Sequence, residues 1–165
     1  MTKPLVSIIM GSDSDLSAMN QGVEVLKEFD VSYEIQILSA HRSPHRVSEF
    51  AENAASQGIK VIIAGAGGAA HLAGVVAAHT TLPVIGVPLN ATPLNGLDSL
   101  LSTVQMPAGI PVATMAVGNS GPKNAAVLAV QMLALSDENL RRKLVEYKKR
   151  LADGVRAKNE KLRSA

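Results

Sequence analysis

A chain of 165 residues has the length of one domain, and folding at this length buries about two-thirds of the surface that the unfolded chain exposes. We therefore expect a single domain over residues 1–165. The chain has no cysteine, which excludes disulfides and thiolate chemistry. No apolar run reaches the ~18 residues of a membrane span, and the N-terminus lacks the pattern of a secretory signal. We expect a cytoplasmic protein without a membrane partner.

The net charge of +2 is unevenly distributed along the chain. Ten Lys and Arg stand against five Asp and Glu from Asp137 onward, which leaves six basic residues against nine acidic ones before it. With only two Tyr, two Phe and no Trp, the chain also lacks aromatic side chains on which bases could stack. These features argue against nucleic acid as a partner. Hydrophobic residues make up 47% of the chain, which favours burial of some apolar surface between subunits.

Short apolar or β-branched runs alternate along the chain with helical patterns. The runs that we predict as strands are residues 5–10, 33–38, 61–65, 83–87 and 111–118. The helices predicted between them are residues 16–29, 44–57 and 70–79. This alternation predicts a doubly wound α/β fold with a parallel sheet, in which polar Glu34 and Gln36 place the second strand near an edge. Residues 88–111, rich in Pro, Gly and Asn, form the longest segment that we expect to be irregular.

Two further helices are predicted after the fifth strand. Residues 124–135 are apolar nearly all round, which is typical of a helix with no face in water, and we expect this helix in an interface between subunits. A C-terminal amphipathic helix begins at about residue 137. We expect it to be packed, because one apolar stripe contains Leu140, Leu144, Tyr147, Leu151 and Val155.

Ligands of an open parallel sheet bind at the carboxyl ends of its strands, because strand-to-helix loops and helix N-termini converge there. The loops in that position are "GSDSD", "SAHRSP", "GAGGAAH" and "PLNATP". In the first, Gly11 permits a close turn, and Ser12 and Ser14 place hydroxyls beside backbone amides, as in a phosphate cradle. An equally good interpretation is that Ser14 or Asp15 caps the following helix. An ionised Asp15 only accepts hydrogen bonds, which suits ribose hydroxyls.

The stretch "SAHRSPHR", residues 39–46, holds two of the four histidines. Pro44 suits the first position of a helix, with Ser43 as its N-cap, so that His41 and Arg42 fall in the preceding loop. An imidazole can both donate and accept a proton near neutral pH, and a guanidinium can bind phosphate through two parallel hydrogen bonds. This pair predicts an acid/base site for a phosphorylated substrate.

A metal site is the alternative for the same stretch, because H-x-x-x-H, here His41 and His45, is a spacing of metal ligands on a helix. The pair straddles the start of the helix, however, and no Cys or carboxylate nearby completes a set of ligands. We therefore expect no metal here, and we place His45 and Arg46 on the surface.

The sequence "GAGGAA", residues 65–70, matches the G-x-G-x-x-A form of the dinucleotide fingerprint. It follows the third predicted strand rather than the first, and no acidic residue lies about 20 positions further on, which argues against a dinucleotide. A loop of small residues instead lets backbone amides approach a planar ligand, with His71 as a second polar contact. His79, two turns further along the predicted helix, is expected to be structural.

Four segments together resemble one protein family. They are "GSDSD", "SAHRSP", "GAGGAAHLAG" and "VQMPAGIPVATMAVGNSGPKNAA". In order and spacing they are similar to the catalytic subunit of phosphoribosylaminoimidazole carboxylase, the class I N5-carboxyaminoimidazole ribonucleotide mutases (PurE) of purine synthesis. The resemblance extends to about Ser136. The family pattern has Thr in place of Ser43 and Pro in place of Ala73.

This resemblance implies a flavodoxin-like three-layer fold, a homo-octamer, and a reaction that moves a carboxylate from the exocyclic nitrogen of an aminoimidazole ribonucleotide to ring carbon C4. It implies no metal or ATP, and a functional link to the ATP-dependent carboxyaminoimidazole ribonucleotide synthase. His41 is implied as the acid/base. The ribonucleotide contacts implied are Ser12, Ser14, Asp15, Ser39, Arg42, Gly68 and His71. Two alternatives stay open: direct carboxylation of aminoimidazole ribonucleotide by carbon dioxide, and a nucleotide-binding module without catalysis.

Overall fold

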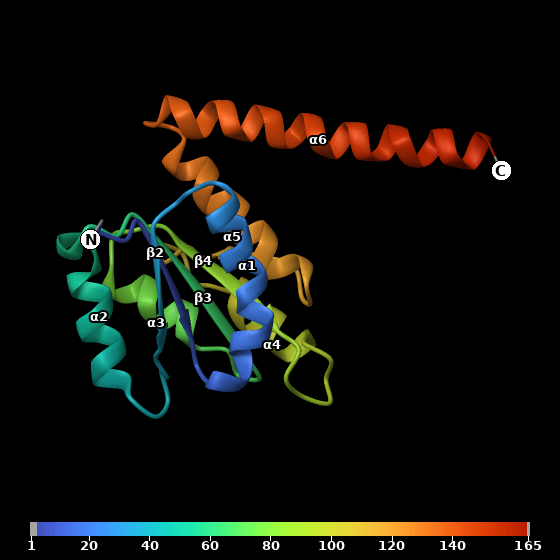
Figure 1. The fold of residues 1–165 in the computed structure, drawn as a ribbon. Coiled ribbons are helices and arrows are strands. Elements are labelled where there is room, and N and C mark those ends of the chain that lie inside the picture. Colours follow the sequence, from blue (N-terminus) through green and yellow to red (C-terminus); the bar gives the residue numbers. More distant parts are fainter. Residues whose placement is uncertain (1–2, 165) are drawn as a thin grey trace.

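The computed structural model describes residues 3–164 and contains a five-stranded parallel sheet with helices on both faces (Figure 1). The strands are β1 (Val6–Met10), β2 (Tyr33–Ile37), β3 (Val61–Gly67), β4 (Val84–Leu89) and β5 (Ala113–Thr114). The helices are a 3-10 turn η1 (Asp13–Asp15), α1 (Leu16–Glu28), α2 (Pro44–Gln57), α3 (Leu72–His79), α4 (Leu97–Val104), α5 (Ser120–Leu133) and α6 (Glu138–Arg163).

The strands are ordered β2-β1-β3-β4-β5, and every pair is parallel. Val6 of β1 is in register with Tyr33 of β2 on one side and with Val61 of β3 on the other. The chain therefore winds outward from β1 to β2 and then returns past β1 to β3, so the direction of winding reverses between β1 and β3. This is the flavodoxin-like order. The predicted doubly wound fold is confirmed, and so is the edge position of the second strand.

Two apolar cores lie on opposite faces of the sheet, because successive side chains of a strand point to opposite sides. Ile8 of β1 packs among side chains of α1 and α5, whereas its neighbour Ile9 packs among those of α2 and α3. Helix α4 belongs to the second layer, since a Cβ added to Gly86 of β4 would meet Thr103 of α4 and Ala73 of α3. The result is a three-layer αβα sandwich.

The segment expected to be irregular contains a helix, α4. Pro93, Asn95 and Gly96 precede it directly, and the last two have positive φ angles of 54° and 84°. Because turn residues dominate the composition of the segment, its sequence pattern did not predict this helix of eight residues. The fifth strand is shorter than the predicted residues 111–118. β5 is only two residues long, because its register with β4 ends after residue 114.

Helix α5 begins four residues earlier than predicted, and its small side chains are buried inside the chain. The Cβ of Ala126 lies 3.7 Å from the position a Cβ would take on Gly22 of α1, so the two helices pack closely. Ala125, Ala129 and Val130 are also buried in this layer. One face of α5 is therefore covered by α1 and the sheet, and its place in an interface between subunits stays a prediction.

Helix α6 packs against the body over its first half only. Leu140 is buried, and Tyr147 stacks at a tilt on Phe29 with ring centroids 5.4 Å apart. Further along the same stripe, Leu151 and Val155 are 51% and 60% exposed. Figure 1 shows why: the second half of α6 projects beyond the sandwich. The expectation of a packed helix was wrong for this half. None of the helices within residues 3–164 is long and apolar enough to cross a membrane.

Candidate active site

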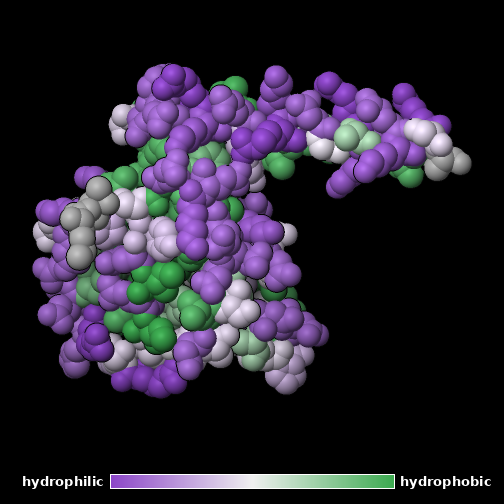
Figure 2. Space-filling model, in the orientation of Figure 1, coloured by the Kyte–Doolittle hydropathy of each residue, from purple (hydrophilic) through white to green (hydrophobic). Residues whose placement is uncertain are grey.

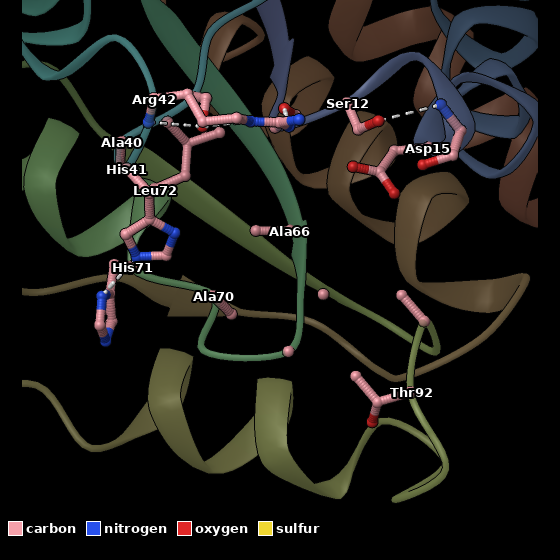
Figure 3. A pocket seen from close by; sticks show the side chains of 16 residues that line it. Ser12, Asp15, Ala40, His41, Arg42, Ala66, Ala70, His71, Leu72 and Thr92 are labelled. Carbon is pink, nitrogen blue, oxygen red and sulfur yellow. Dashed lines mark hydrogen bonds between the residues drawn. The ribbon is translucent and has the colours of Figure 1, made fainter.

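A cavity of about 420 Å³ lies at the carboxyl ends of β1 to β4, where the direction of winding reverses (Figure 3). Its walls come from four loops, residues 11–15, 39–42, 66–72 and 91–92. The structure brings all the predicted site residues into this lining: Ser12, Ser14, Asp15, Ser39, His41, Arg42, Gly68 and His71. The sequence placed these residues on three separate loops, and the fold gathers them around one space.

Two histidines meet at the side of the cavity. Nε2 of His41 and Nδ1 of His71 are 2.8 Å apart, and the rings lie edge to face with their centroids 4.9 Å apart. His41 belongs to the loop after β2, and His71 is the residue directly before α3. Each side chain remains exposed, so a ligand in the cavity can reach both rings. Because a single proton lies between these two nitrogens, one ring donates and the other accepts.

The other two histidines lie outside the cavity lining. His45 is exposed on the first turn of α2, and its neighbour Arg46 is exposed as well. His79, at the end of α3, has its Nδ1 3.1 Å from Oε1 of Glu52 and so links α3 to α2. These positions agree with the surface and structural roles expected for them.

The Arg42 side chain crosses from the loop after β2 to the loop after β1. Its Nη2 donates a hydrogen bond of 2.6 Å to the carbonyl oxygen of Gly11, and its Nε donates to Oγ of Ser39 at 3.3 Å. The backbone N–H of Arg42 donates to the same Ser39 hydroxyl at 3.1 Å. Figure 3 shows the guanidinium lying toward Ser12 and Asp15. The cation is thereby held among the groups that surround a candidate anion site.

The "GSDSD" loop uses its side chains differently from the capping interpretation. Ser12 is the N-cap of the 3-10 turn and accepts a hydrogen bond from the backbone N–H of Ser14. Neither Ser14 nor Asp15 caps α1 with its side chain. Burial raises the pKa of the Asp15 carboxyl above 3.8, and the neighbouring Arg42 cation offsets this only in part. The Asp15 carboxylate makes no capping hydrogen bond to α1 and lines the edge of the cavity.

Ser43 is the N-cap residue of α2, as predicted, but its side chain makes no capping hydrogen bond. Its hydroxyl donates to the carbonyl oxygen of Ser39 at 3.1 Å and accepts from the backbone N–H of Ser39 at 3.2 Å, so it makes no capping bond to α2. Pro44 does occupy the first position of α2, as predicted. The Ser43 hydroxyl instead closes the loop that carries His41 and Arg42.

The loop after β3 forms the apolar side of the cavity. A Cβ on Gly67 would lie 2.5 Å from the Cβ of Ala91, and Gly68 has a φ of +62°, so glycine is required at both positions. These residues let the loop after β4 approach closely. Sequence reasoning pointed to the small residues of this loop but did not single out four other lining residues: Ala40, Leu72, Ala91 and Thr92. Their position directly after strand ends was the only signal that could have pointed to them.

The sequence profile of the AIR carboxylase family matches residues 5–154. The chain belongs to this family. It is 57% identical over 159 residues to the N5-carboxyaminoimidazole ribonucleotide mutase of Thermotoga maritima, an alignment that covers 96% of this chain and 92% of that protein. It is 55% identical over 162 residues to the phosphoribosylaminoimidazole carboxylase of Saccharomyces cerevisiae, which covers 98% of this chain but only 28% of that much longer protein.

The fold is similar to that of solved AIR carboxylase relatives. The crystal structure of Treponema denticola PurE superposes with a TM-score of 0.87 at 30% sequence identity, covering 96% of this chain and 98% of that chain. The family match and the strand order thus indicate the same fold. Neither observation depends on how the side chains are arranged in the cavity.

Proposed function

We propose that this protein is an N5-carboxyaminoimidazole ribonucleotide mutase, which moves the carboxylate from the exocyclic nitrogen N5 to ring carbon C4. The observation that carries the proposal is the His41–His71 pair beside Arg42 in a single cavity, in a chain 57% identical to the Thermotoga maritima mutase. The pair supplies a group that can give and take a proton, and Arg42 supplies a partner for a phosphate.

The polar side of the cavity binds the ribonucleotide in this proposal. Arg42 and the Ser12 and Ser14 hydroxyls contact the phosphate, because a guanidinium fork, hydroxyls and a helix start all favour an anion. Asp15 accepts hydrogen bonds from ribose hydroxyls. Ser39 orients Arg42 through the two hydrogen bonds described above. The aminoimidazole ring then faces the small-residue loop, near Gly68 and His71.

The first half-reaction breaks the N–C bond of the carbamate. Protonated His41 gives its proton to N5 as the bond breaks, the bonding electrons stay on nitrogen, and carbon dioxide is released into the cavity. This leaves an uncharged aminoimidazole group on the ribonucleotide and neutral His41. The hydrogen bond to His71 holds the His41 ring in one orientation for the transfer.

The second half-reaction forms the new C–C bond. Electrons of the amino-substituted ring attack carbon dioxide through C4, which gives a carboxylate at a carbon that still carries its hydrogen. Neutral His41 removes that hydrogen as a proton, and the ring regains its aromaticity. His41 ends protonated, as it began, so the cycle balances without an external acid or base.

The proposal is tested by supplying each of two substrates separately at low bicarbonate. The mutase reaction requires conversion of the carboxyamino ribonucleotide to the 4-carboxy product, with little product from aminoimidazole ribonucleotide alone. Product from aminoimidazole ribonucleotide in proportion to added bicarbonate, with no use of the carboxyamino compound, would assign direct carboxylation instead. Binding without turnover of either would leave only a nucleotide-binding module.

We also propose that the chain acts as one domain in a cytoplasmic homo-oligomer of eight subunits. Hydrophobic side chains lie among hydrophilic ones on the projecting part of α6 (Figure 2). The exposed ones, Leu151, Val155 and Leu162, support assembly, because such a stripe is seldom left in water. Leu135, 84% exposed before α6, adds to this surface. Light scattering at micromolar concentration should give a mass near eight chains, and a monomer would refute the assembly. A functional link to the ATP-dependent synthase follows from the need to supply a labile carbamate.

A further inference from the structure

Residues 90–96, between β4 and α4, form a wall of the cavity through Ala91 and Thr92. Thr92 is partly buried, and its hydroxyl makes two hydrogen bonds away from the cavity. It donates to Oδ2 of Asp98 at 2.6 Å and accepts from the backbone N–H of Leu94 at 3.2 Å. Figure 3 shows Thr92 across the cavity from Arg42. The two hydrogen bonds of the hydroxyl thus fix the orientation of the Thr92 side chain.

The methyl group of Thr92 rests on the glycine turn after β3. Its Cγ2 lies 3.7 Å from the position of a Cβ on Gly68, and the Cβ of Ala91 fills the space that a Cβ on Gly67 would need. The wall and the turn together present methyl and methylene groups to the cavity, including those of Ala66 and Ala70. The side chains of Ala66, Ala70 and Ala91 on this side of the cavity form no hydrogen bonds with water.

Asp98 lies in the first turn of α4, where the helix dipole favours a negative charge. The hydrogen bond from Thr92 holds the pKa of the Asp98 carboxyl below 3.8, so the acceptor is charged at neutral pH. Oδ1 of Asp98 is buried and has no hydrogen-bond partner within residues 3–164. Backbone N–H groups of Ser99 and Asp98 also favour the charged carboxylate, and the hydrogen bond from Thr92 ties the wall to α4 as a fixed point.

We propose that Asp98 is a positioning residue that acts through Thr92: it holds residues 90–96 on the glycine turn, and this wall retains the carbon dioxide freed between the two half-reactions. The proposal rests on the mutase function proposed above. Carbon dioxide is small and apolar, so its exchange with solution depends on how closely the wall packs on the glycine turn. Loosening the wall should release carbon dioxide without preventing the ribonucleotide from binding.

The test measures how much of the transferred carboxyl group exchanges with solution. The substrate carries a ¹³C carboxylate, the solution holds unlabelled bicarbonate with carbonic anhydrase, and mass spectrometry gives the fraction of product that has lost the label. The background from spontaneous decarboxylation is measured without enzyme and subtracted. We expect Thr92→Val, which keeps the shape but loses the hydroxyl, and Asp98→Asn, which loses the charge, to raise this fraction by about threefold or more, with KM changed by less than about twofold.

Two further variants complete the experiment. Thr92→Ser keeps the hydroxyl and should stay closer to the wild type than Thr92→Val does. Thr80→Val is the matched control, because Thr80 accepts the backbone N–H of Leu82 at 3.2 Å in the same kind of turn but lies outside the cavity lining. Thr80→Val should leave the exchanged fraction unchanged.

Wild-type exchange in both Thr92→Val and Asp98→Asn, with melting temperatures showing folded protein, would overturn the role of Asp98. Equal exchange in Thr92→Ser and Thr92→Val would also overturn it, because the hydroxyl would then not matter. If the wild-type protein does not convert the labelled substrate at all, the mutase function fails instead. The two failures are therefore separable.

Discussion

His41 Nε2 lies 2.8 Å from His71 Nδ1, although the two residues are thirty positions apart in the chain. The contact joins the loop after β2 to the start of α3 and places both rings at one side of the cavity. A hydrogen bond between two imidazoles restricts the rotation of each ring. In the proposed reaction, His41 moves the proton and His71 orients it.

Replacing His71 by alanine should therefore lower kcat more than it weakens substrate binding. A neutral hydrogen bond contributes about 1 kcal/mol net, so we expect a loss of about fivefold in kcat from orientation alone. His79→Ala is the control, because this exposed histidine pairs with Glu52 away from the cavity. Steady-state kinetics of both variants give the comparison. Equal losses in the two would show that the effect is not specific to the contact with His41.

Replacing Arg42 by lysine tests the assignment of the phosphate. Lysine keeps the charge but loses the planar fork, and a charge-assisted hydrogen bond is worth about 1.5–3 kcal/mol, so KM should rise by about 10- to 100-fold. Arg46→Lys changes the same residue type at an exposed position outside the cavity and should be nearly neutral. A substrate analogue without phosphate should lose much less with Arg42→Lys. The same loss on both compounds would remove the phosphate from the role of Arg42.

Asp15 should reduce the stability of the protein at neutral pH. Its pKa is raised in the folded state because burial disfavours the charged form. The contribution of Asp15 to the free energy of unfolding therefore keeps its full value below pH 3.8, and it falls as the pH rises through the folded pKa of Asp15. Asp15→Asn should therefore raise the free energy of unfolding at pH 7 while impairing ribonucleotide binding, and the gain in stability should shrink toward pH 4.

Denaturant unfolding of the wild type and of Asp15→Asn at both pH values provides the measurement for Asp15. Asp153→Asn removes the same charge from an exposed position on α6, outside the cavity lining, and should give no gain. A destabilised Asp15→Asn variant at pH 7 would show that the hydrogen bonds and the Arg42 charge outweigh burial at this position.

The order of elements could be predicted from the sequence because the buried strands are short apolar runs and the helices α1 and α2 between them are amphipathic. α2 was predicted with the boundaries that it has, since Pro44 marks its start and Gly58, with a φ of +103°, its end. α4 was missed because its turn residues outweigh eight helical ones. The projection of α6 could not be predicted, because periodicity shows which face of a helix is apolar but not what covers it.

The candidate site was predicted as a set of loops rather than as a geometry. His41 and Arg42 stand out because they follow a strand directly, and the parallel sheet brings such loops together. Their partners could not be read from the sequence in the same way. The bonds from Arg42 to Gly11 and from His41 to His71 depend on the register of β1 with β2 and β3, which no local pattern encodes. The tie between Thr92 and Asp98 depends on a turn whose following helix was not expected.

The most direct test of the account compares His41→Asn with His45→Asn, because His41 lies in the cavity lining and His45 lies just beyond Pro44 on α2. Asparagine keeps hydrogen bonding but cannot carry the proton, and a general acid/base is worth about 10²- to 10⁴-fold in rate. The measurement is turnover of the carboxyamino ribonucleotide, alongside ribonucleotide binding and thermal melting of each variant. The account predicts that His41→Asn folds and binds but loses at least about a hundredfold in kcat, whereas His45→Asn is close to wild type. Substantial turnover by His41→Asn, or a larger loss in His45→Asn, would contradict it.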